Sequence, residues 1–546
     1  MVTKKRPLAT VIFMLFVSLV LLLAGCSKSG GGADKGSEDA GQNADNQKPL
    51  KISVMAGSFG ATPKGTLIQE EWQKRMESYI GRKLDIDWTY VPWGEYGDKF
   101  KLTLASGDLP DIMTNFGGEL AIQYGRQGIV LDIAKYMNDM PNYKKYVDNT
   151  PYAKTKLYTP EGNMYYFGDG WWNEEGNEGT AYGSIYRFDL FKKHNIKIPE
   201  TLDEFYDAAK KLKGVYPDSY PVNTYSSWPA VHEGLLYSNH TSLGLYWNGE
   251  KYVYGPVEDA FKETLMFLNK LYKEKLLDPE FATQSDDQVK QKMATGKSFM
   301  MPLTWYGNAD ELNKMSNEGA EWGGALLPNN PKYGKAWKGW SAEPGKLLSN
   351  NNGVLISAKA KEPELLVKMI DYQYSDEMVN LLNWGIEGVT YEVKDGKKQF
   401  LPEITNDPIP AKKLEPFGVS SSGSNRSGFV FTPQDFASDI AKYKPMPFYA
   451  DGQYMTGKSK ELTNKYGGKE SIAPNDRAPN VTLNKEQEAT KSEIMTPIET
   501  YVSESVIKFV TGATSFDQWD KYLADINKMG DYTLVLKMMN DAVAVK

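Results

Sequence analysis

Residues 51–113 alternate between the hydrophobic pattern of strands and that of helices, and this order most constrains the fold. In the strand segments apolar residues recur at every second position, whereas from Ile68 to Ile80 they recur at every fourth. A Ser-Gly pair closes the second helix, as is typical of helix C-caps. An open α/β sheet with ligand sites at strand ends is therefore expected. The expected strands are 51–56, 85–91 and 110–113, and the expected helices are 70–80 and 96–105.

Further patterns extend this α/β assignment along the chain, and no internal repeat is present. Thr201 and Glu204 have the spacing of a capping box, which predicts the start of a helix that runs through Leu212. Pro363 suits the first turn of another helix. The other expected strands are 183–186, 323–328 and 353–357, and the other expected helices are 188–194, 260–276, 363–372, 515–528 and 532–545.

The first 25 residues have the parts of a secretory signal. Residues 4–6 are basic, a long apolar stretch follows, and it ends in the segment LAGC at 23–26. Small residues before a cysteine resemble the bacterial lipobox. Cys26 is the only cysteine, so it has no disulfide partner and no companion for a metal site. We expect cleavage before Cys26 and stable anchoring by two acyl chains on it; the alternative is an uncleaved transmembrane anchor.

Residues 26–50 are expected to be the lipidated cysteine and a disordered tether. Gly, Ser, Asp, Asn and Lys dominate this stretch, so it has little to bury. As a flexible coil the tether would reach about 25–30 Å. The part that follows, from about residue 51 to residue 546, is too long for one core and predicts at least two domains. It contains no apolar run long enough to cross a bilayer.

Charge and composition exclude several classes of function. The formal charge is −7, and loss of the three basic residues of the leader makes it −10. An acidic chain without a basic block is a poor nucleic-acid binder. Only three histidines are present and no second cysteine, so we expect no metal site of that kind and no cofactor. Motifs of phosphate loops, serine hydrolases and zinc proteases are missing.

Aromatic residues are abundant, with 13 Trp and 34 Tyr. The apolar C–H face of a sugar ring stacks on indole, and its hydroxyls bond to carboxylates and amides. The aromatic content of an acidic secreted chain therefore favours a carbohydrate binder.

Four segments, taken in order, resemble bacterial extracellular solute-binding proteins of the oligosaccharide type (family 1). More narrowly, they are similar to the large lipoproteins that supply ABC importers. The segments are KFKLTLASGDLPDIM (99–113), IYRFDLFKKHNIKIPETLDEFYDAAKKLK (185–213), LNWGIEGVTYEVKDGKK (382–398) and VIKFVTGATSFDQWDKYLADINKMG (506–530). The third is close to a Gly-Ile/Val-Glu-Gly signature of the large subfamily.

The resemblance implies a periplasmic-binding-protein-like fold of type II, with two discontinuous lobes, a hinge and a helical C-terminal region. It also implies capture of an oligosaccharide between the lobes, delivery to ABC permease subunits, no catalysis, and a location on the outer face of the cytoplasmic membrane. Some relatives carry a calcium loop, but residues 212–222 lack its alternating oxygen ligands, so no metal is expected. The expected boundaries give lobe 1 the residues 51–180 and 326–415, and lobe 2 the residues 181–325 and 416–546.

Three tryptophans follow the periodicity of a core, namely Trp72, Trp88 and Trp519. Trp171 and Trp172 instead fall in an expected loop of glycines and acids, where they form a stacking platform at the lobe boundary or anchor the loop.

The resemblance adds Trp305 and Trp384 as aromatic residues that stack on sugar. Trp228 and Trp340 are loop tryptophans that are also expected to contact the ligand. The complete set of expected ligand-binding residues is Asp111, Trp171, Trp172, Trp228, Trp305, Trp340, Trp384 and Glu387.

Asp111 and Glu387 are the acidic members of this set, and we expect them to accept hydrogen bonds from sugar hydroxyl groups. The alternatives are structural: Asp111 caps a local turn, and Glu387 holds its own loop. Two other functions stay open at this point, a secreted glycoside hydrolase, which needs a pair of carboxylates, and a binding lipoprotein for a non-sugar ligand such as a peptide.

Overall fold

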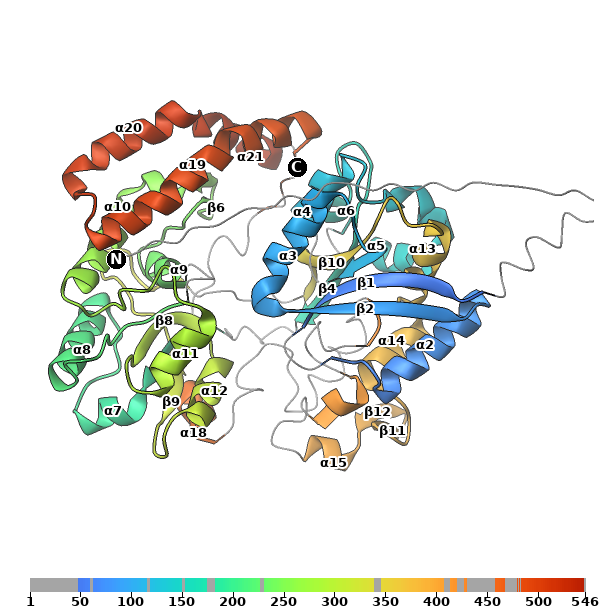
Figure 1. Cartoon of the computed structure of the whole chain (residues 1–546), viewed down its shortest axis with the longest axis horizontal. Coiled ribbons are helices and arrows are strands. Elements are labelled where there is room, and N and C mark those ends of the chain that lie inside the picture. The colour runs from blue at the N-terminus through green and yellow to red at the C-terminus, as the bar shows by residue number, and fades with distance from the viewer. Residues whose placement is uncertain are drawn as a thin grey trace, which may run out of the picture. The chain divides into compact units, whose positions relative to one another are not determined.

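The structure is a computed structural model (Figure 1), and it describes most of the chain after residue 47. Residues Pro49–Lys546 form one folded unit. The expected leader, Cys26 and nearly all of the tether lie outside the described residues. The described residues are 48–58, 62–114, 118–149, 153–173, 182–225, 230–337, 345–406, 413–419, 427–429, 457–466, 479, 481 and 483–544.

The three strands expected near the start of the folded part form one side of the first sheet, and the expected helices connect them. β1 (Leu50–Ser58) pairs in parallel with β2 (Leu84–Pro92) and with β3 (Ile112–Thr114). α2 (Leu67–Ile80) and α3 (Trp93–Ser106) make the crossovers, as expected (Figure 1). Both helices end in a glycine with φ near +70°, a conformation that disfavours side chains with a Cβ.

A return of the chain completes the first sheet, whose order is β2-β1-β3-β10-β4. β10 (Gly345–Ile356) runs antiparallel to β3 and to β4 (Phe167–Asn173). The expected strand at 353–357 is therefore the end of a longer strand. The other helices of this part are α4 (Gly118–Gly125), η1 (Ile133–Asp139), α5 (Pro141–Asn149), α6 (Ala153–Leu157), α13 (Pro363–Tyr372) and α14 (Asp376–Trp384).

The second sheet is antiparallel, with β5 (Tyr182–Arg187) between β8 (Met300–Trp305) and β9 (Trp322–Ala325). Its helices include α7 (Phe188–Lys193), α8 (Leu202–Val215), α9 (Ala230–Ser238), α10 (Asp259–Lys273), α11 (Asp286–Ala294) and α12 (Gly307–Met315).

Of the two hydrogen bonds of the expected capping box, one is present at the start of α8. The Thr201 hydroxyl accepts from the Glu204 N–H at 3.2 Å, but the Glu204 carboxylate accepts from the N–H of Glu200 at 2.8 Å. The reciprocal bond thus falls one residue before the N-cap. The helix still begins where the sequence predicts.

Two separate hydrophobic cores belong to the two sheets. The first core takes its residues from 50–167 and 354–429, and the second from 186–325 and 462–539. Trp72 and Trp519 are buried in these cores and Trp88 packs against the first, which confirms the structural interpretation of all three. The expected lobe boundaries stay predictions.

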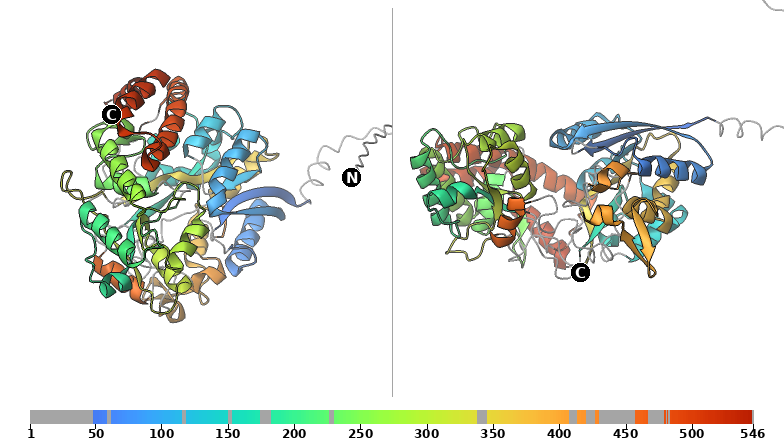
Figure 2. Two further views of the ribbon diagram at one scale, coloured as in Figure 1. Left: turned by 60° about the vertical axis from the view of Figure 1, so that its left-hand side comes forward. Right: turned by 90° about the horizontal axis from the view of Figure 1, so that it is seen from below.

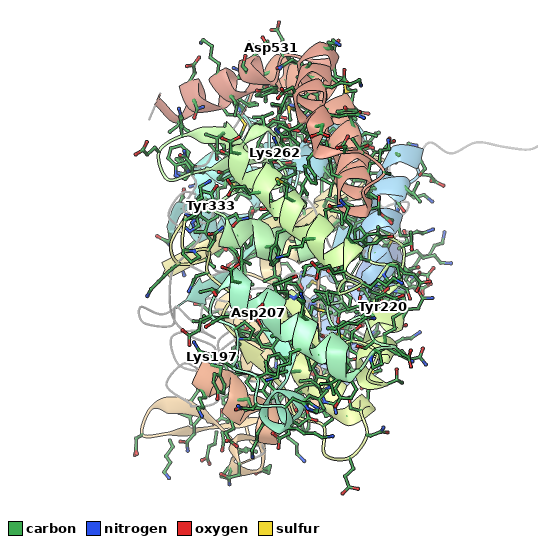
Figure 3. The ribbon with its side chains drawn as sticks, turned by 90° about the vertical axis from the view of Figure 1, so that its left-hand side faces the viewer. Lys197, Asp207, Tyr220, Lys262, Tyr333 and Asp531 are labelled. Carbon is green, nitrogen blue, oxygen red and sulfur yellow. The ribbon has the colours of Figure 1, made fainter. Side chains whose placement is uncertain are left out.

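The last two helices of the chain were expected from the sequence, and a longer helix, α19, precedes them. α19 (Lys485–Thr511) packs against α10, and α20 (Trp519–Met529) and α21 (Tyr532–Ala544) pack against α19 (Figure 2). Figure 3 views these helices together with α8 and α10, with Asp207 on α8 and Lys262 on α10 labelled. The Lys262 ammonium lies 5.6 Å from the centroid of the Trp519 ring.

The remaining elements are short, apart from one helix of ten residues. Among the described residues, none of the helices combines the length and the apolarity that a membrane crossing needs. The elements not yet named are β6 (Leu245–Trp247), β7 (Tyr252–Tyr254), β11 (Tyr391–Lys394), β12 (Lys397–Phe400), η2 (Gly255–Val257), α15 (Pro402–Thr405), η3 (Glu415–Phe417), α18 (Gly457–Tyr466) and η5 (Phe516–Gln518).

Candidate ligand-binding site

The end of β8 presents an aromatic side chain and an amide at the edge of the second sheet. The residues of β8 before Trp305 are buried, but Trp305 itself is partly exposed. Tyr306 and Gly307 are buried again, and Asn308 is the next partly exposed residue. Trp305 is the last residue of β8, and Asn308 is the second residue of α12, so the passage from strand to helix carries a partly exposed indole and a partly exposed amide.

Asn308 was not among the expected site residues. Its amide nitrogen donates to the Thr304 hydroxyl at 2.7 Å, which fixes the orientation of the amide group. In the sequence, Asn308 can be noticed only as a polar residue that follows the segment Trp-Tyr-Gly after an expected strand. Hydrophobic periodicity does not detect it.

Tyr182 lies opposite Trp305 in the register of β5 and β8. Burial raises the pKa of the Tyr182 hydroxyl, so this group is protonated at neutral pH. Close to it, Leu303, Leu327 and Ala336 form a small apolar cluster against which Tyr182 and Tyr237 pack. Two tyrosines therefore pack against apolar side chains at this end of the sheet.

The segment after β9 folds back onto α9 and adds further aromatic packing to this end of the sheet. The Trp337 N–H donates to the carbonyl of Tyr237 at 3.1 Å, and the His240 ring stacks on Trp337 at 4.8 Å with an interplanar angle of 13°. Trp337 also packs against Tyr246. Leu327 and Trp337 thus contact residues of the second sheet and its helices, although both positions lie in the stretch expected to belong to lobe 1.

The structure places Trp384 in the first core and not on a surface. It is the last residue of α14 and has no exposed area. Phe400 stacks on its ring at 4.8 Å, and Tyr391 packs at 5.9 Å. A side chain with no exposed area offers no face to a ligand in this conformation, so the structure does not support the expected stacking on sugar.

Asp111 holds two strands of the first sheet together. One of its carboxylate oxygens accepts from both the N–H and the hydroxyl of Ser53, each at 2.8 Å, and its own N–H donates to that hydroxyl at 3.0 Å. Asp111 also precedes β3, at the amino end of the strand, whereas ligands in open α/β sheets bind at carboxyl ends. These bonds favour the structural role over ligand contact.

Glu387 is exposed in a loop that other residues hold together. The Thr390 hydroxyl donates to the carbonyl of Trp384 at 2.6 Å and accepts from the N–H of Ile386 at 2.9 Å. Gly388 donates its N–H to the Tyr391 carbonyl at 2.7 Å. The carboxylate of Glu387 is therefore not needed to close the loop, and its role as a hydroxyl acceptor stays a prediction.

The backbone of Trp171 and Trp172 is in strand β4, whereas a loop was expected. Trp171 pairs with Leu347 and Trp172 with Lys346, because β10 extends far enough to give this segment a partner. Trp228 and Trp340 lie outside the described residues. Of the expected site residues whose side chains the structure describes, Asp111 and Trp384 belong to the part of the fold around the first sheet, whereas Trp305, which is partly exposed, lies on the second.

The segment 212–222, in which no calcium loop was expected, contains a lysine contact. The carbonyl of Ser219 accepts from Lys213 Nζ at 2.6 Å, and the same ammonium lies 4.9 Å from the centroid of the Tyr220 ring. Within the described ranges, His, Cys, Asp and Glu side chains form no group of three that could hold a metal ion.

Comparison with known proteins agrees with these two sheets and two cores. The crystal structure of alginate-binding protein AlgQ2 without calcium ion is similar over 91% of this chain and 98% of its own, with a TM-score of 0.65 and 22% identity. The likeness shows the two-lobe α/β fold of solute-binding proteins. The family model for bacterial extracellular solute-binding proteins matches residues 63–380, and the chain belongs to that family.

Two relatives carry names that state a ligand. The fructooligosaccharide ABC transporter substrate-binding protein FusA of Streptococcus pneumoniae is 23% identical over 97% of each chain. The polygalacturonan/rhamnogalacturonan-binding protein YtcQ of Bacillus subtilis is 25% identical over 70% of this chain and 75% of its own. Both are binding proteins.

Proposed function

We propose that the protein captures an oligosaccharide and delivers it to the permease subunits of an ABC importer. The observation that carries the proposal is the partly exposed Trp305 at the end of the buried strand β8, followed by the partly exposed Asn308 at the start of α12. An indole face suits the C–H surface of a sugar ring, and an amide suits its hydroxyls. The names of the two relatives support this class of ligand.

We infer that the bound sugar is not changed chemically. The proposal rests on membership of a family of binding proteins. Incubation with kestose, raffinose, stachyose and oligogalacturonate distinguishes the possibilities: a binding protein saturates and releases no new reducing ends, whereas a glycoside hydrolase releases them. A thermal-shift screen of the same sugars identifies a binder, because a ligand at 100 times its Kd adds about 2.7 kcal/mol of stability.

Replacement of Trp305 with alanine should weaken binding of the sugar found in that screen by about five-fold to more than one-hundred-fold. The reason is the loss of an aromatic face, for which we expect about 1–3 kcal/mol. Stability should fall by less than the loss of about 3–5 kcal/mol typical of a core tryptophan, because Trp305 is partly exposed. Titration calorimetry and thermal melts measure the two effects. Trp305→Phe is the control. Unchanged affinity in Trp305→Ala would show that the ligand binds elsewhere.

We further propose that a lipid on Cys26 holds the protein at the outer face of the cytoplasmic membrane, with residues 27–50 as the tether. Only a thiol takes the diacylglyceryl group, so Cys26→Ala should abolish labelling with a radioactive fatty acid. Labelling equal to that of the wild type would exclude Cys26 as the attachment point.

A further inference from the structure

The six-membered ring of the Trp305 indole lies directly on the α-carbon of Gly307. A Cβ built on Gly307 would lie within 2.5 Å of three atoms of that ring, a distance at which no side chain fits. Gly307 does not have a positive φ, so its backbone conformation suits any residue. Alanine would even favour the first turn of α12 by up to about 1 kcal/mol over glycine. The glycine is therefore required by the indole and not by the backbone.

Tyr306, between these two residues, fixes the backbone against the sheet. Its hydroxyl donates to the Ala325 carbonyl on β9 at 2.9 Å. Its ring covers two further glycines: a Cβ on Gly183 of β5 would lie within 2.7 Å of it, and one on Gly324 of β9 within 2.6 Å. Since Tyr306 is buried, contacts β5 and is bonded to β9, the backbone at Gly307 cannot retreat from the ring. A Cβ at position 307 would have to displace the indole.

We infer that Gly307 is a positioning residue for ligand binding, because its lack of a side chain lets the Trp305 indole keep the orientation in which it is partly exposed. The inference rests on the proposed oligosaccharide function. A rigid aromatic surface binds with less loss of conformational entropy than one that must be ordered by the ligand. The free protein has this order already, because one side of the ring is pressed against the α-carbon of Gly307.

A double-mutant cycle on the full folded chain tests the inference. Gly307→Ala should weaken binding of the sugar identified in the screen by about five-fold or more, with a melting temperature close to that of the wild type. In the Trp305→Ala background the same substitution should have no effect, because there is no indole left to displace. Gly214→Ala in α8 is the matched control: this helical glycine also lacks a positive φ and has nothing within 4 Å of its built Cβ.

A second measurement needs no sugar. In protein labelled with 5-fluorotryptophan, the fluorine resonance absent from Trp305→Phe belongs to Trp305. Gly307→Ala should shift or broaden that resonance, and Gly214→Ala should leave it in place.

An unmoved Trp305 resonance would overturn the inference, as would an effect of Gly307→Ala on affinity of the same size in both backgrounds. Affinity of Gly307→Ala within two-fold of the wild type would overturn it too. If the wild type binds no sugar of the panel, the proposed function fails, and the fluorine spectrum still decides whether Gly307 positions the indole.

Discussion

Replacement of Trp384 with alanine should destabilise the protein by about 3–5 kcal/mol, the range for removal of a buried tryptophan. The side chain is fully buried in the first core, where it stacks on Phe400 and packs against Tyr391. These two residues lie on the hairpin of β11 and β12, so the cavity left by the substitution would separate α14 from this hairpin. Denaturant unfolding measures the loss.

Trp384→Phe is the matched variant for this prediction. It keeps most of the apolar area and removes the indole N–H, which is buried and has no hydrogen-bond partner among the described residues. Because an unsatisfied buried donor is itself unfavourable, the loss should stay below about 1.5 kcal/mol. Affinity for sugar should be that of the wild type. A Trp384→Ala variant that keeps its stability and loses binding would instead restore Trp384 to the ligand site.

Trp305 and Trp384 show what the sequence can and cannot predict about the site. Each tryptophan is the last residue of an element and is soon followed by a glycine: directly in the case of Trp384, and after one intervening residue in the case of Trp305. Their local patterns are therefore alike. Their exposure differs because of residues distant along the chain or in the next hairpin. Phe400 covers Trp384, whereas on the second sheet the bond to the distant Ala325 holds Tyr306 inside and Trp305 stays partly exposed. No local pattern contains this information.

The fold could be predicted more fully than the site, because the sequence patterns that indicate helices and strands are local. Alternation and four-residue spacing predicted β1, α2, β2 and α3, and each was found with its ends within a few residues. The strand at Trp171 and Trp172 was missed for the opposite reason. Its glycines and acids are typical of a loop, and only pairing with β10, more than 170 positions later in the chain, makes it a strand.

The sequence also does not show which charged side chains are buried. Lys292 on α11 carries a charge like any other lysine, yet its ammonium contacts four oxygen atoms. It lies 3.0 Å from both carboxylate oxygens of Asp278, 2.6 Å from Glu280 and 2.9 Å from the amide oxygen of Gln284. The Asp278 side chain is only 3% exposed. The ammonium is therefore the counter-charge of a buried carboxylate.

Replacement of Lys292 with methionine should destabilise the protein by about 3–5 kcal/mol, because it leaves the Asp278 charge buried without its partner. Burial by itself lowers the pKa of Lys292, but hydrogen bonds with Glu280 and Asp278 outweigh it and raise the pKa. The ammonium is thus charged at neutral pH, where the contribution to stability is fully present, and it is lost only as the pH rises through that raised value. Urea unfolding at pH 7 measures the effect.

The same helix supplies the control for this prediction. Lys290 Nζ lies 2.8 Å from Glu311, but that carboxylate is 47% exposed, so Lys290→Met should change stability by less than about 1 kcal/mol. Addition of Asp278→Asn to Lys292→Met should recover part of the loss, because the uncompensated charge is then removed. Equal losses from Lys290→Met and Lys292→Met would show that burial of Asp278 is not the cause. A double variant no more stable than Lys292→Met would show instead that the oxygen contacts, and not the charge, stabilise this part of the second sheet.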